Sequence, residues 1–437
     1  MHVTATAAPV TTTTDARRVG LACGIGTAIE RYDFFIYGTA AAVVFGPQFF
    51  PQVSEFAGQL AAFATFALGF IALPLGGAVM GHFGDRLGRK SMLVWSLMLM
   101  GVSTFAIGLL PNYAQIGIWA PLLLVTLRFI QGFALGGEWA GAVLMSVEHA
   151  PTERRGLYGS FVALGVPVGL VFANFIFLIA TTSVGREQFL AWGWRIPFLA
   201  SAVLVAVGLL IRIGVSESPV FADVRARKAE RPMPVLDVLR GHWRTVALAA
   251  GSYLSCSATG YIAVVYFVSY ATRELGLSLT TTFAIVVSSA MILGVSLVLF
   301  ATFSDRWGRR SIMIRGLCGL AIWSLLFFPL IDTKSLPLIW FAVAGVMFLQ
   351  GPYMGTQPAI FSELFPATVR YSGASLSQTL GVILGGALAP LIATTLFERT
   401  GSSWGITSYL VTMGILSWLC GLGLKQETYR QTLTHEG

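Results

Sequence analysis

The sequence predicts an all-α membrane protein in which twelve transmembrane helices form two pseudo-symmetric six-helix bundles. Three observations lead to this fold class. Apolar residues fill 55% of the 437 positions and charged residues only 11%, which is too apolar for a chain whose surface faces water. Apolar runs long enough to cross a bilayer recur along the whole chain. Two motifs of the first half return in the second half, as expected of a duplicated bundle.

The transmembrane spans are the apolar runs of about 20 residues that polar segments separate. The 48 glycines and 18 prolines suit helices that pack closely and bend within a bilayer. Residues 1–18 contain no apolar core of the length that a signal peptide requires, so we expect a cytoplasmic tail there. The predicted spans are 19–46, 57–80, 91–110, 119–146, 156–180, 195–215, 245–270, 281–302, 312–331, 337–361, 374–397 and 404–424.

Lys and Arg residues concentrate in alternate loops, and this bias predicts a multi-pass protein of the cytoplasmic (inner) membrane with both termini in the cytoplasm. The longest loop on that side, 216–244, is charged and contains proline. It is the predicted linker between an N-terminal bundle at 19–215 and a C-terminal bundle at 245–424, and 425–437 is a second cytoplasmic tail. The net charge of +8 is spread over short loops, so we predict no nucleic-acid partner.

Two short motifs occur twice in the chain. The segment GHFGDRLGRKS at 81–91 returns as TFSDRWGRRS at 302–311, and EHAPTERRG at 148–156 returns as ELFPATVRYSG at 363–373. Within each pair the shared residues are separated by one common offset, and the two offsets are nearly equal. This agreement predicts that the two halves arose by duplication and share one fold.

On these motifs the chain resembles the major facilitator superfamily over residues 19–424. Its segments ERYDFFIYG (30–38), RFIQGFALGGEW (128–139), WGWRIPF (192–198) and SESPVF (216–221) are similar to the metabolite:proton symporter branch of that family. Relatives in this branch transport shikimate, oxoglutarate, citrate, and proline or betaine. The resemblance implies alternating access, in which two bundles rock about a site near the middle of the membrane.

The resemblance also implies an inner gate, a network of charged residues that closes the cytoplasmic side and breaks when the transporter opens inward. Exposed ion pairs are individually worth about 0–1 kcal/mol, so a cluster of them favours one state without locking it. The alternative is that these charges set the topology and cap helix ends. The residues of the predicted inner-gate network are Asp85, Arg89, Glu148, Arg155, Glu217, Asp305, Arg309, Glu363 and Arg370.

Ionisable residues near the middle of the first and fourth spans are the candidate substrate and proton sites. Glu30 and Asp33 lie about 17–21 Å into the first span at ~1.5 Å per residue, and a charge at that depth costs roughly 2.5–3.5 kcal/mol unless it pairs or faces water. The alternative is that Arg31 and Arg128 neutralise the carboxylates in fixed salt bridges. The candidates on these two spans are Glu30, Arg31, Asp33, Tyr37, Arg128, Gln131 and Glu138.

Spans 7 and 10 add uncharged groups that form hydrogen bonds. Gln350, Tyr353 and Gln357 share one helical face, and Tyr261 lies in span 7. In the superfamily, spans 1, 4, 7 and 10 line the central cavity, so the resemblance implies that these four residues complete the site. Tyrosines also pack near membrane interfaces, which is the alternative for Tyr266 and Tyr270 of span 7.

These features predict a secondary active transporter that takes up a small organic acid or zwitterionic metabolite with a proton and functions as a monomer. Proton coupling requires a carboxyl group that binds and releases a proton between states. Of Glu30, Asp33 and Glu138 we favour Asp33, because the symporter branch has an aspartate at this place. Arg31 and Arg128 are suited to bind a substrate carboxylate.

Other classes of protein fit the sequence less well. An exporter that exchanges a drug or metabolite for protons would have the same fold, but the antiporter motif of span 5 is represented only by GVPVG at 165–169. A sensor or scaffold would not need charges at midplane. The sequence has no phosphate-binding loop, and its four cysteines and five histidines lack the spacing of metal ligands. We therefore predict no enzyme activity, no cofactor and no metal site.

Overall fold

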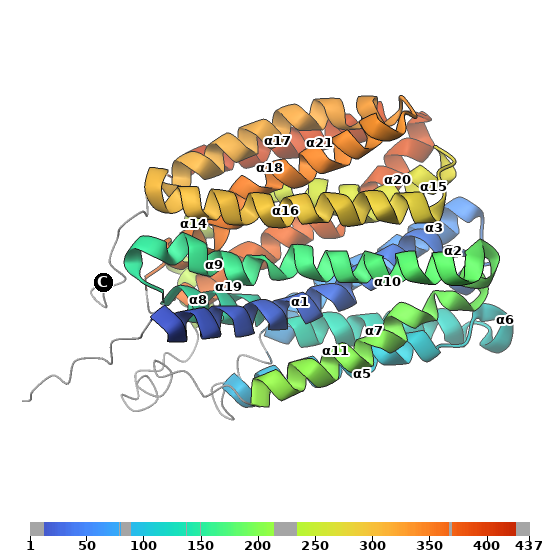
Figure 1. Ribbon diagram of the computed structural model, residues 1–437, viewed down its shortest axis with the longest axis horizontal. Helices are drawn as coiled ribbons and strands as arrows, with labels where there is room; N and C mark the ends of the chain where they lie inside the picture. The colour runs from blue at the N-terminus through green and yellow to red at the C-terminus, as the bar shows by residue number, and fades with distance from the viewer. Residues whose placement is uncertain are drawn as a thin grey trace, which may run out of the picture.

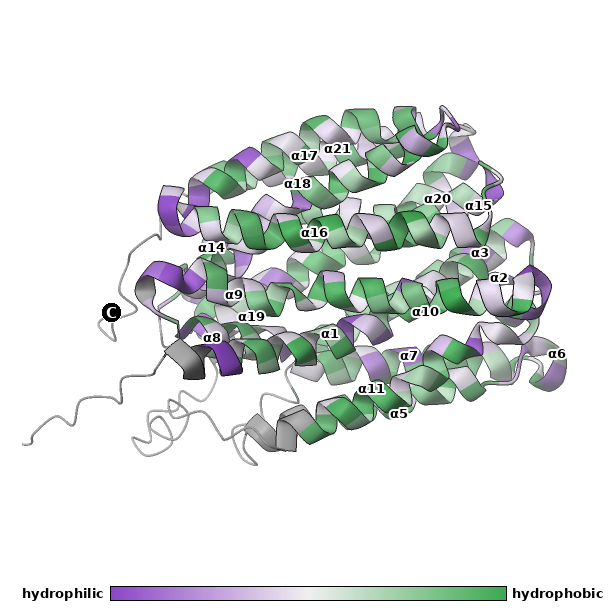
Figure 2. Cartoon of the chain, viewed as in Figure 1, coloured by the Kyte–Doolittle hydropathy of each residue, from purple (hydrophilic) through white to green (hydrophobic). Residues whose placement is uncertain are grey.

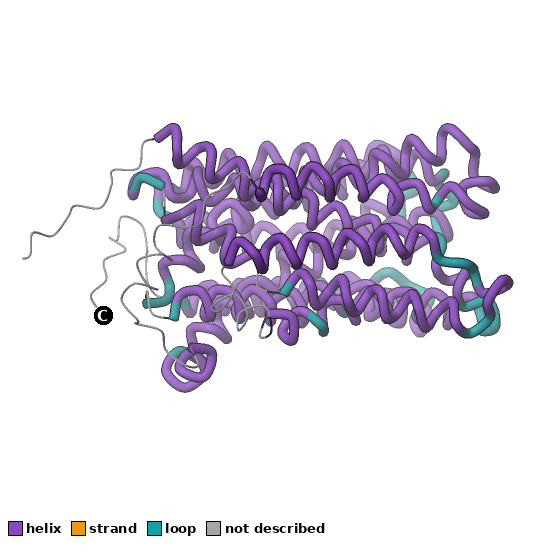
Figure 3. The backbone as a smooth tube through the Cα atoms, turned by 90° about the horizontal axis from the view of Figure 1, so that it is seen from below, coloured by secondary structure: helices purple, strands orange, loops and turns teal. Residues whose placement is uncertain are grey.

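The computed structural model describes residues 13–77, 79, 89–136, 138–148, 150–213, 234–366 and 369–424. Within these ranges every regular element is a helix, and the helices run side by side along the long axis of the molecule (Figure 3). The predicted all-α fold class is confirmed. Figure 2 shows that apolar residues predominate along the middle of the helices, whereas hydrophilic residues gather mainly at both ends.

The first half of the chain, blue to green in Figure 1, forms the N-terminal six-helix bundle. The short helices α2 (Phe45–Phe49) and α6 (Tyr113–Ile116) connect crossings at one end of the molecule. The crossings themselves are α1 (Thr13–Val43), α3 (Glu55–Ile71), α5 (Arg89–Leu109), α7 and α8 (Trp119–Leu135 and Glu138–Glu148), α9 and α10 (Arg155–Ala163 and Gly165–Gln188), and α11 (Arg195–Ile213). The 3-10 turn η1 (Thr152–Arg154) precedes α9, and the π-helix η2 (Phe189–Gly193) follows α10.

The second half, yellow to red in Figure 1, repeats this arrangement. Two of its crossings contain a π-helix, a local widening that is frequent at functional sites. The crossings are α14, η3 and α15 (Trp243–Tyr261, Ile262–Tyr266 and Phe267–Arg273), α16 (Leu279–Trp307), α17 (Arg309–Ile331), α18 (Leu336–Glu363), α19, η4 and α20 (Arg370–Gly381, Val382–Ala387 and Ala389–Thr400), and α21 (Trp404–Gly423).

The predicted spans match these helices closely. Among the described residues nine helices are long and apolar enough to cross a membrane, and Val94–Leu109 and Arg195–Leu210 are shorter apolar helices. With α1 they account for the twelve predicted spans. The prediction of a loop after residue 180 is wrong, because the helical segment continues to Gly193. It is interrupted at Gly185, whose φ of 75° glycine adopts without steric clash. Polar residues had suggested a loop there.

The predicted linker at 216–244 and both predicted tails lie largely outside the described residues. At the end of that linker, Pro234–Gly241 forms the helix α13, where a loop had been expected. This correction follows from the apolar valines and leucines of the segment, since Val238 is fully buried against Phe365 and neighbouring apolar residues. The predicted boundaries of the two bundles stay a prediction.

Contacts between the two halves determine how a central site is enclosed. Along their length the halves meet where α10 packs against α16. At one end, named here the network end, α8 and α9 pack against α16 and α18. At the opposite end, α3 packs against η4 and α20, and α1 packs against η3 and α15. The interior is therefore covered at both ends.

Gly308 shapes the turn that joins α16 to α17 at the network end. Its φ of 89° lies in a region that side chains disfavour, so glycine lets α16 end and α17 begin within a single residue. This tight turn brings Asp305 of the last turn of α16 beside Arg309 at the start of α17, with Arg309 Nη2 lying 3.4 Å from Asp305 Oδ1.

Candidate functional site

The predicted midplane residues of α1, α7 and α8 lie inside the protein. Glu30, Asp33, Arg128, Gln131 and Glu138 are between 0% and 6% exposed. Because burial in a bilayer is costly for ionisable groups, such side chains require partners or a polar chamber. The burial also excludes an arrangement in which these groups point outward at lipid.

Arg128 is held by aromatic rings rather than by a carboxylate. Its guanidinium carbon lies 4.0 Å from the ring centre of Phe34 and 4.1 Å from that of Tyr37, a favourable cation–π arrangement. Gly69 of α3 makes room for it, since a Cβ there would lie 2.5 Å from Arg128 Nε. Among the described residues no carboxylate forms an ion pair with Arg128. The fixed salt bridge considered above is therefore not formed by this arginine.

A series of hydrogen bonds connects Arg128 to Asp33. Arg128 Nη1 donates to Gln131 Oε1 at 3.2 Å, and Gln131 Nε2 donates to Thr104 Oγ1 at 2.7 Å. Thr104 Oγ1 in turn donates to Asp33 Oδ2 at 2.9 Å. The positive and negative groups at midplane thus communicate through two uncharged side chains.

The third crossing supplies hydroxyl groups to both helices that carry midplane carboxylates. Besides Thr104, Ser96 Oγ of α5 donates to Glu138 Oε2 at 3.1 Å. Sequence reasoning missed these two residues, because the superfamily resemblance directs attention to spans 1, 4, 7 and 10. The sequence did contain a signal for them, namely two hydroxyl residues on one face of an apolar span. The spacing of Ser96 and Thr104 places them within about 80° of each other around a helix.

A small cavity lies beside these groups, between α1, α3, α7, α8 and α19. Its volume is about 30 Å³, measured as the space that the centre of a water molecule can occupy. This is room for roughly two waters. An organic acid does not fit into a volume of this size. The lining residues are Glu30, Arg31, Phe70, Leu73, Leu135, Trp139, Ser375, Gln378, Thr379 and Val382.

The cavity contains residues that the sequence analysis had not assigned to the site. Ser375, Gln378 and Thr379 come from α19 in the eleventh crossing. Their signal in the sequence is a helix whose start carries several hydroxyl and amide side chains within an otherwise apolar span. Together with Glu30 and Arg31 they offer a carboxylate, a guanidinium and uncharged donors to a polar ligand.

The predicted residues of spans 7 and 10 are buried but do not line this cavity. Gln350 Nε2 donates to Cys256 O at 3.2 Å, which ties α18 to α14. Tyr353 stacks on Tyr253 with ring centres 5.5 Å apart, and Gln357 is 4% exposed. Their assignment to the substrate site stays a prediction.

Tyr261 lies where the two halves meet. Its ring centre lies 5.6 Å from that of Phe66 and 5.3 Å from that of Phe70, both of which belong to α3. Arg31 lies beside it and acts on it electrostatically. Tyr261 therefore packs the C-terminal half against α3 of the N-terminal half.

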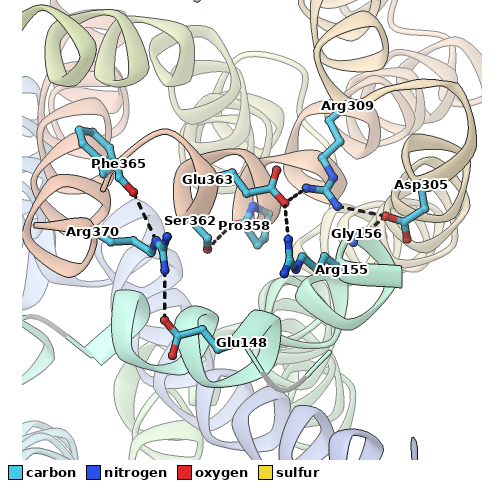
Figure 4. A network of polar contacts seen from close by, with 10 residues as sticks. All are labelled: Glu148, Arg155, Gly156, Asp305, Arg309, Pro358, Ser362, Glu363, Phe365 and Arg370. Atoms are coloured by element: carbon cyan, nitrogen blue, oxygen red, sulfur yellow. Dashed lines mark hydrogen bonds and ion pairs between the residues drawn. The ribbon is translucent and has the colours of Figure 1, made fainter. Parts of the chain in front are cut away.

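At the network end, three carboxylates and three arginines join the two halves across their interface (Figure 4). Glu363 of α18 accepts from Arg309 and lies 3.7 Å from Arg155 Nη1 of α9. Separately, Arg370 Nη1 of α19 lies 3.6 Å from Glu148 Oε1 of α8. Both clusters cross from one half to the other, so they hold the network end shut.

Asp305 adds a third link between the halves. Its carboxylate accepts from the backbone N–H of Gly156 at 2.8 Å and of Leu157 at 2.9 Å, at the start of α9. A helix N-terminus has unsatisfied N–H groups and a positive partial charge, so a carboxylate there is stabilised. A residue of α16 in one half thus caps a helix of the other half.

The structure brings together six of the nine predicted inner-gate residues. They are Glu148, Arg155, Asp305, Arg309, Glu363 and Arg370. Asp85 and Glu217 lie outside the described residues, and of Arg89 only the backbone, at the start of α5, is described.

Opposite the network end, one exposed ion pair among the described residues joins the halves. Arg273 Nη1 at the end of α15 lies 3.2 Å from Glu55 Oε1 at the start of α3, and the Glu55 side chain is 80% exposed. Such a pair contributes little to stability.

Comparison with known proteins matches residues 23–390 to the family model of the Major Facilitator Superfamily. The chain is 43% identical to the inner membrane metabolite transport protein YhjE of Escherichia coli (strain K12), with 95% of each chain covered. It is 39% identical to the shikimate transporter of the same organism, with 94% of each covered. A glycine betaine/proline/ectoine/pipecolic acid transporter, OusA of Dickeya dadantii, is 31% identical over 94% of this chain and 83% of its own.

Among solved structures, the fold matches a proton:xylose symporter, XylE, bound to 6-bromo-6-deoxy-D-glucose. The TM-score is 0.75 at 20% identity, with 96% of this chain and 98% of that chain covered. A partially occluded inward-open form of XylE from E. coli matches with a TM-score of 0.73 at 19% identity, covering 95% and 99%. At this identity the likeness concerns the fold alone.

Proposed function

The chain belongs to the major facilitator superfamily, and from this premise we propose that it takes up a small organic acid or zwitterionic metabolite together with a proton. The family consists of membrane transporters rather than enzymes, so the chain is a multi-pass membrane protein that transports a metabolite. The proposal adds three things, namely the direction of transport, the coupling to protons and the class of substrate.

The observation that carries the proposal is the joint burial of Asp33 and Arg128 in the same bundle as Glu30 and Arg31, which border the cavity. Asp33 is 1% exposed and Arg128 0% exposed, and they are connected without direct contact. A carboxyl group in such surroundings responds strongly to the arrival of a charged ligand or a change in hydration. This is the property that a proton-coupled transporter requires of its proton-binding group.

The substrate class follows from the groups that border the cavity. Arg31 offers a guanidinium, which binds a carboxylate through two parallel hydrogen bonds, and α19 adds amide and hydroxyl donors. The named substrates of the relatives, shikimate in one case and betaine or proline in another, all contain a carboxylate. We therefore propose a substrate with one carboxylate and a polar remainder.

We assign the network end to the cytoplasm and take 19–215 and 245–424 as the two moving units of an alternating-access cycle. The links of Figure 4 are then the inner gate, and they separate when the protein opens inward. The exposed pair of Arg273 and Glu55 separates when it opens outward. One chain contains the whole site in this scheme, so we propose that the monomer is the functional unit.

The proposal is tested by reconstituting the purified protein into liposomes. Uptake of radiolabelled shikimate, oxoglutarate, citrate, proline and betaine is measured with and without an inwardly directed proton gradient. We expect a gradient to drive accumulation of at least one of them. Loss of preloaded substrate from the vesicles under the same inwardly directed proton gradient, with no uptake, would instead favour an exporter, because an antiporter exchanges entering protons for leaving substrate.

The role of Asp33 is tested in the same vesicles. Asp33→Asn should abolish accumulation but preserve exchange of labelled for unlabelled substrate, because exchange needs no net proton movement. The control is Glu398→Gln, which neutralises an exposed carboxylate of α20 and should retain accumulation. Uphill accumulation by Asp33→Asn would remove Asp33 from the mechanism.

A further inference from the structure

Thr104 of α5 is buried between the two charged groups of the proposed proton site. We propose that Thr104 is a positioning residue for the proton of Asp33. Gln131, itself held by Arg128, orients the Thr104 hydroxyl group, which donates to Asp33 while Asp33 is charged and accepts from Asp33 once it carries a proton. This series of hydrogen bonds from Arg128 to Asp33 is called here the relay. The inference rests on the proposed function in taking Asp33 as the group that binds the transported proton. It concerns a crossing that supplies no residue to the cavity.

Arg128 determines the direction of the hydrogen bonds. A guanidinium can only donate, so the side chain of Gln131 must turn its oxygen towards Arg128 Nη1, 3.2 Å away. Its NH₂ group then faces Thr104 and donates to Oγ1 at 2.7 Å. The reversed amide would place two donors against each other. Thr104 therefore receives one hydrogen bond from the Arg128 side and keeps its own proton.

That proton has two acceptors at equal distance. Thr104 Oγ1 lies 2.9 Å from Asp33 Oδ2 and 2.9 Å from the backbone oxygen of Met100, one turn earlier on α5. A hydroxyl group has a single proton, so it can donate to only one of them at a time. The geometry thus offers two positions for the proton that require no movement of the backbone.

The protonation state of Asp33 selects between the two positions. While Asp33 is charged it accepts from Thr104, because a hydrogen bond to a charged group is the stronger one. Once Oδ2 carries a proton, Oδ2 donates to the remaining lone pair of Thr104, and Thr104 donates to Met100 O. The hydroxyl then accepts from Gln131 and Asp33 and donates once, which is its full capacity.

Few other described groups interact with the carboxylate of Asp33. The charged side chains that act on it are Glu30, one turn earlier on α1, and Arg128 of α7. Neighbouring α5 has no ionisable residue between 94 and 109, and α11 has none between 196 and 210. The other carboxylate oxygen, Oδ1, has no hydrogen-bond partner. Thr104 is thus the only described side chain that forms a hydrogen bond with Asp33.

The test titrates the protein in lipid vesicles without any substrate. Infrared difference spectra are recorded over a range of pH, and the carboxyl C=O band of Asp33 is identified as the band that Asp33→Asn removes. Thr104→Val removes the hydroxyl group and keeps the shape, whereas Thr104→Ser keeps the hydroxyl group. The matched control is Ser103→Ala, because Ser103 is a buried neighbour on α5 that donates only to Leu99 O of its own helix.

We expect Thr104→Val to move the pH midpoint of this band upward by at least about one unit, because the carboxylate loses its donor. Thr104→Ser should restore the midpoint to within a few tenths of a unit, and Ser103→Ala should leave it unchanged. Gln131→Met, which breaks the connection to Arg128, should move it in the same direction by less. If Thr104→Val does not fold, the pH midpoint of the Asp33 band in Gln131→Met tests the proposal instead.

Unchanged midpoints in Thr104→Val and Gln131→Met would overturn the proposal, and so would the absence of any band that depends on Asp33. Failure of the relay is distinguishable from failure of the proposed function. Unchanged midpoints in a protein that still accumulates substrate under a proton gradient would overturn the relay alone. Shifted midpoints in a protein that accumulates none of the tested solutes would support the relay and refute proton-coupled uptake of those solutes.

Discussion

Glu363 joins two arginines across the interface of the halves, and neutralising it should open the network end. Its carboxylate accepts from Arg309 of its own half and lies 3.7 Å from Arg155 of the other half. The side chains of Glu363 and Arg309 are each 1% exposed, and that of Arg155 is 8% exposed. Glu363→Gln keeps the size of the side chain and removes only its charge.

The magnitude follows from the burial of this cluster. Breaking a buried ion pair by removing one partner costs about 3–5 kcal/mol, and a hydrogen bond to a charged group is worth about 1.5–3 kcal/mol. Arg155 and Arg309 have further partners, so we expect Glu363→Gln to raise the free energy of the closed state by about 2–3 kcal/mol. The cost falls on the closed state only, because the separated groups of the open state face water. The open-to-closed ratio should therefore rise roughly 30- to 150-fold.

The assay measures how fast a buried position reacts with a water-soluble maleimide. Ser362, next to Glu363, is fully buried, and Ser362→Cys is introduced after the four native cysteines are replaced. Its labelling rate is proportional to the open fraction when opening is fast, so Glu363→Gln should accelerate labelling by at least tenfold. Glu398→Gln, which alters an exposed carboxylate of α20, serves as the control. A labelling rate within twofold of the parent would refute the reasoning.

The remaining predictions use the same protein and the same vesicles. Gly156→Ala should also accelerate labelling, because its Cβ would lie 2.7 Å from the backbone oxygen of Ala301 across the interface, whereas Gly141→Ala, with its nearest contact at 3.7 Å, should not. Arg128→Lys should lower the rate of proton-driven uptake at least about tenfold, because an ammonium group cannot replace a planar guanidinium between rings. The yield of folded protein in size-exclusion chromatography should not fall, and unchanged uptake would contradict the prediction. Arg273→Ala should change the rate of uptake less than about twofold at low and at high salt, because its ion pair is exposed.

The crossings could be predicted because each depends on a short stretch of chain. A helix needs about 20 apolar residues to cross hydrocarbon, wherever its neighbours lie. The predicted span 281–302 therefore agrees with α16 (Leu279–Trp307), apart from one polar turn at the network end. The same dependence on local composition explains the error after residue 180. The polar residues of that segment predicted a loop, although the backbone continues as a helix.

The buried charges could be predicted in part. The cost of a charge at midplane implied that Asp33 and Arg128 face the interior, and both are buried. Their partners could not be predicted from spacing. Arg128 lies among Phe34, Tyr37 and Phe66 instead of against a carboxylate, because Gly69 lets α3 approach closely.

Hydropathy and the repeated motifs were sufficient to predict the number of crossings, the duplication of the bundle and the family, whereas the orientation predicted from the charge bias stays a prediction. These properties add up along the chain, so they need no knowledge of how one helix sits against another. The folded arrangement alone decided that Thr104 lies between Gln131 and Asp33, and that Asp305 caps a helix of the other half. A hydrogen bond depends on the rotation and offset of two helices to within a few tenths of an ångström, and no residue pattern on either helix contains that information.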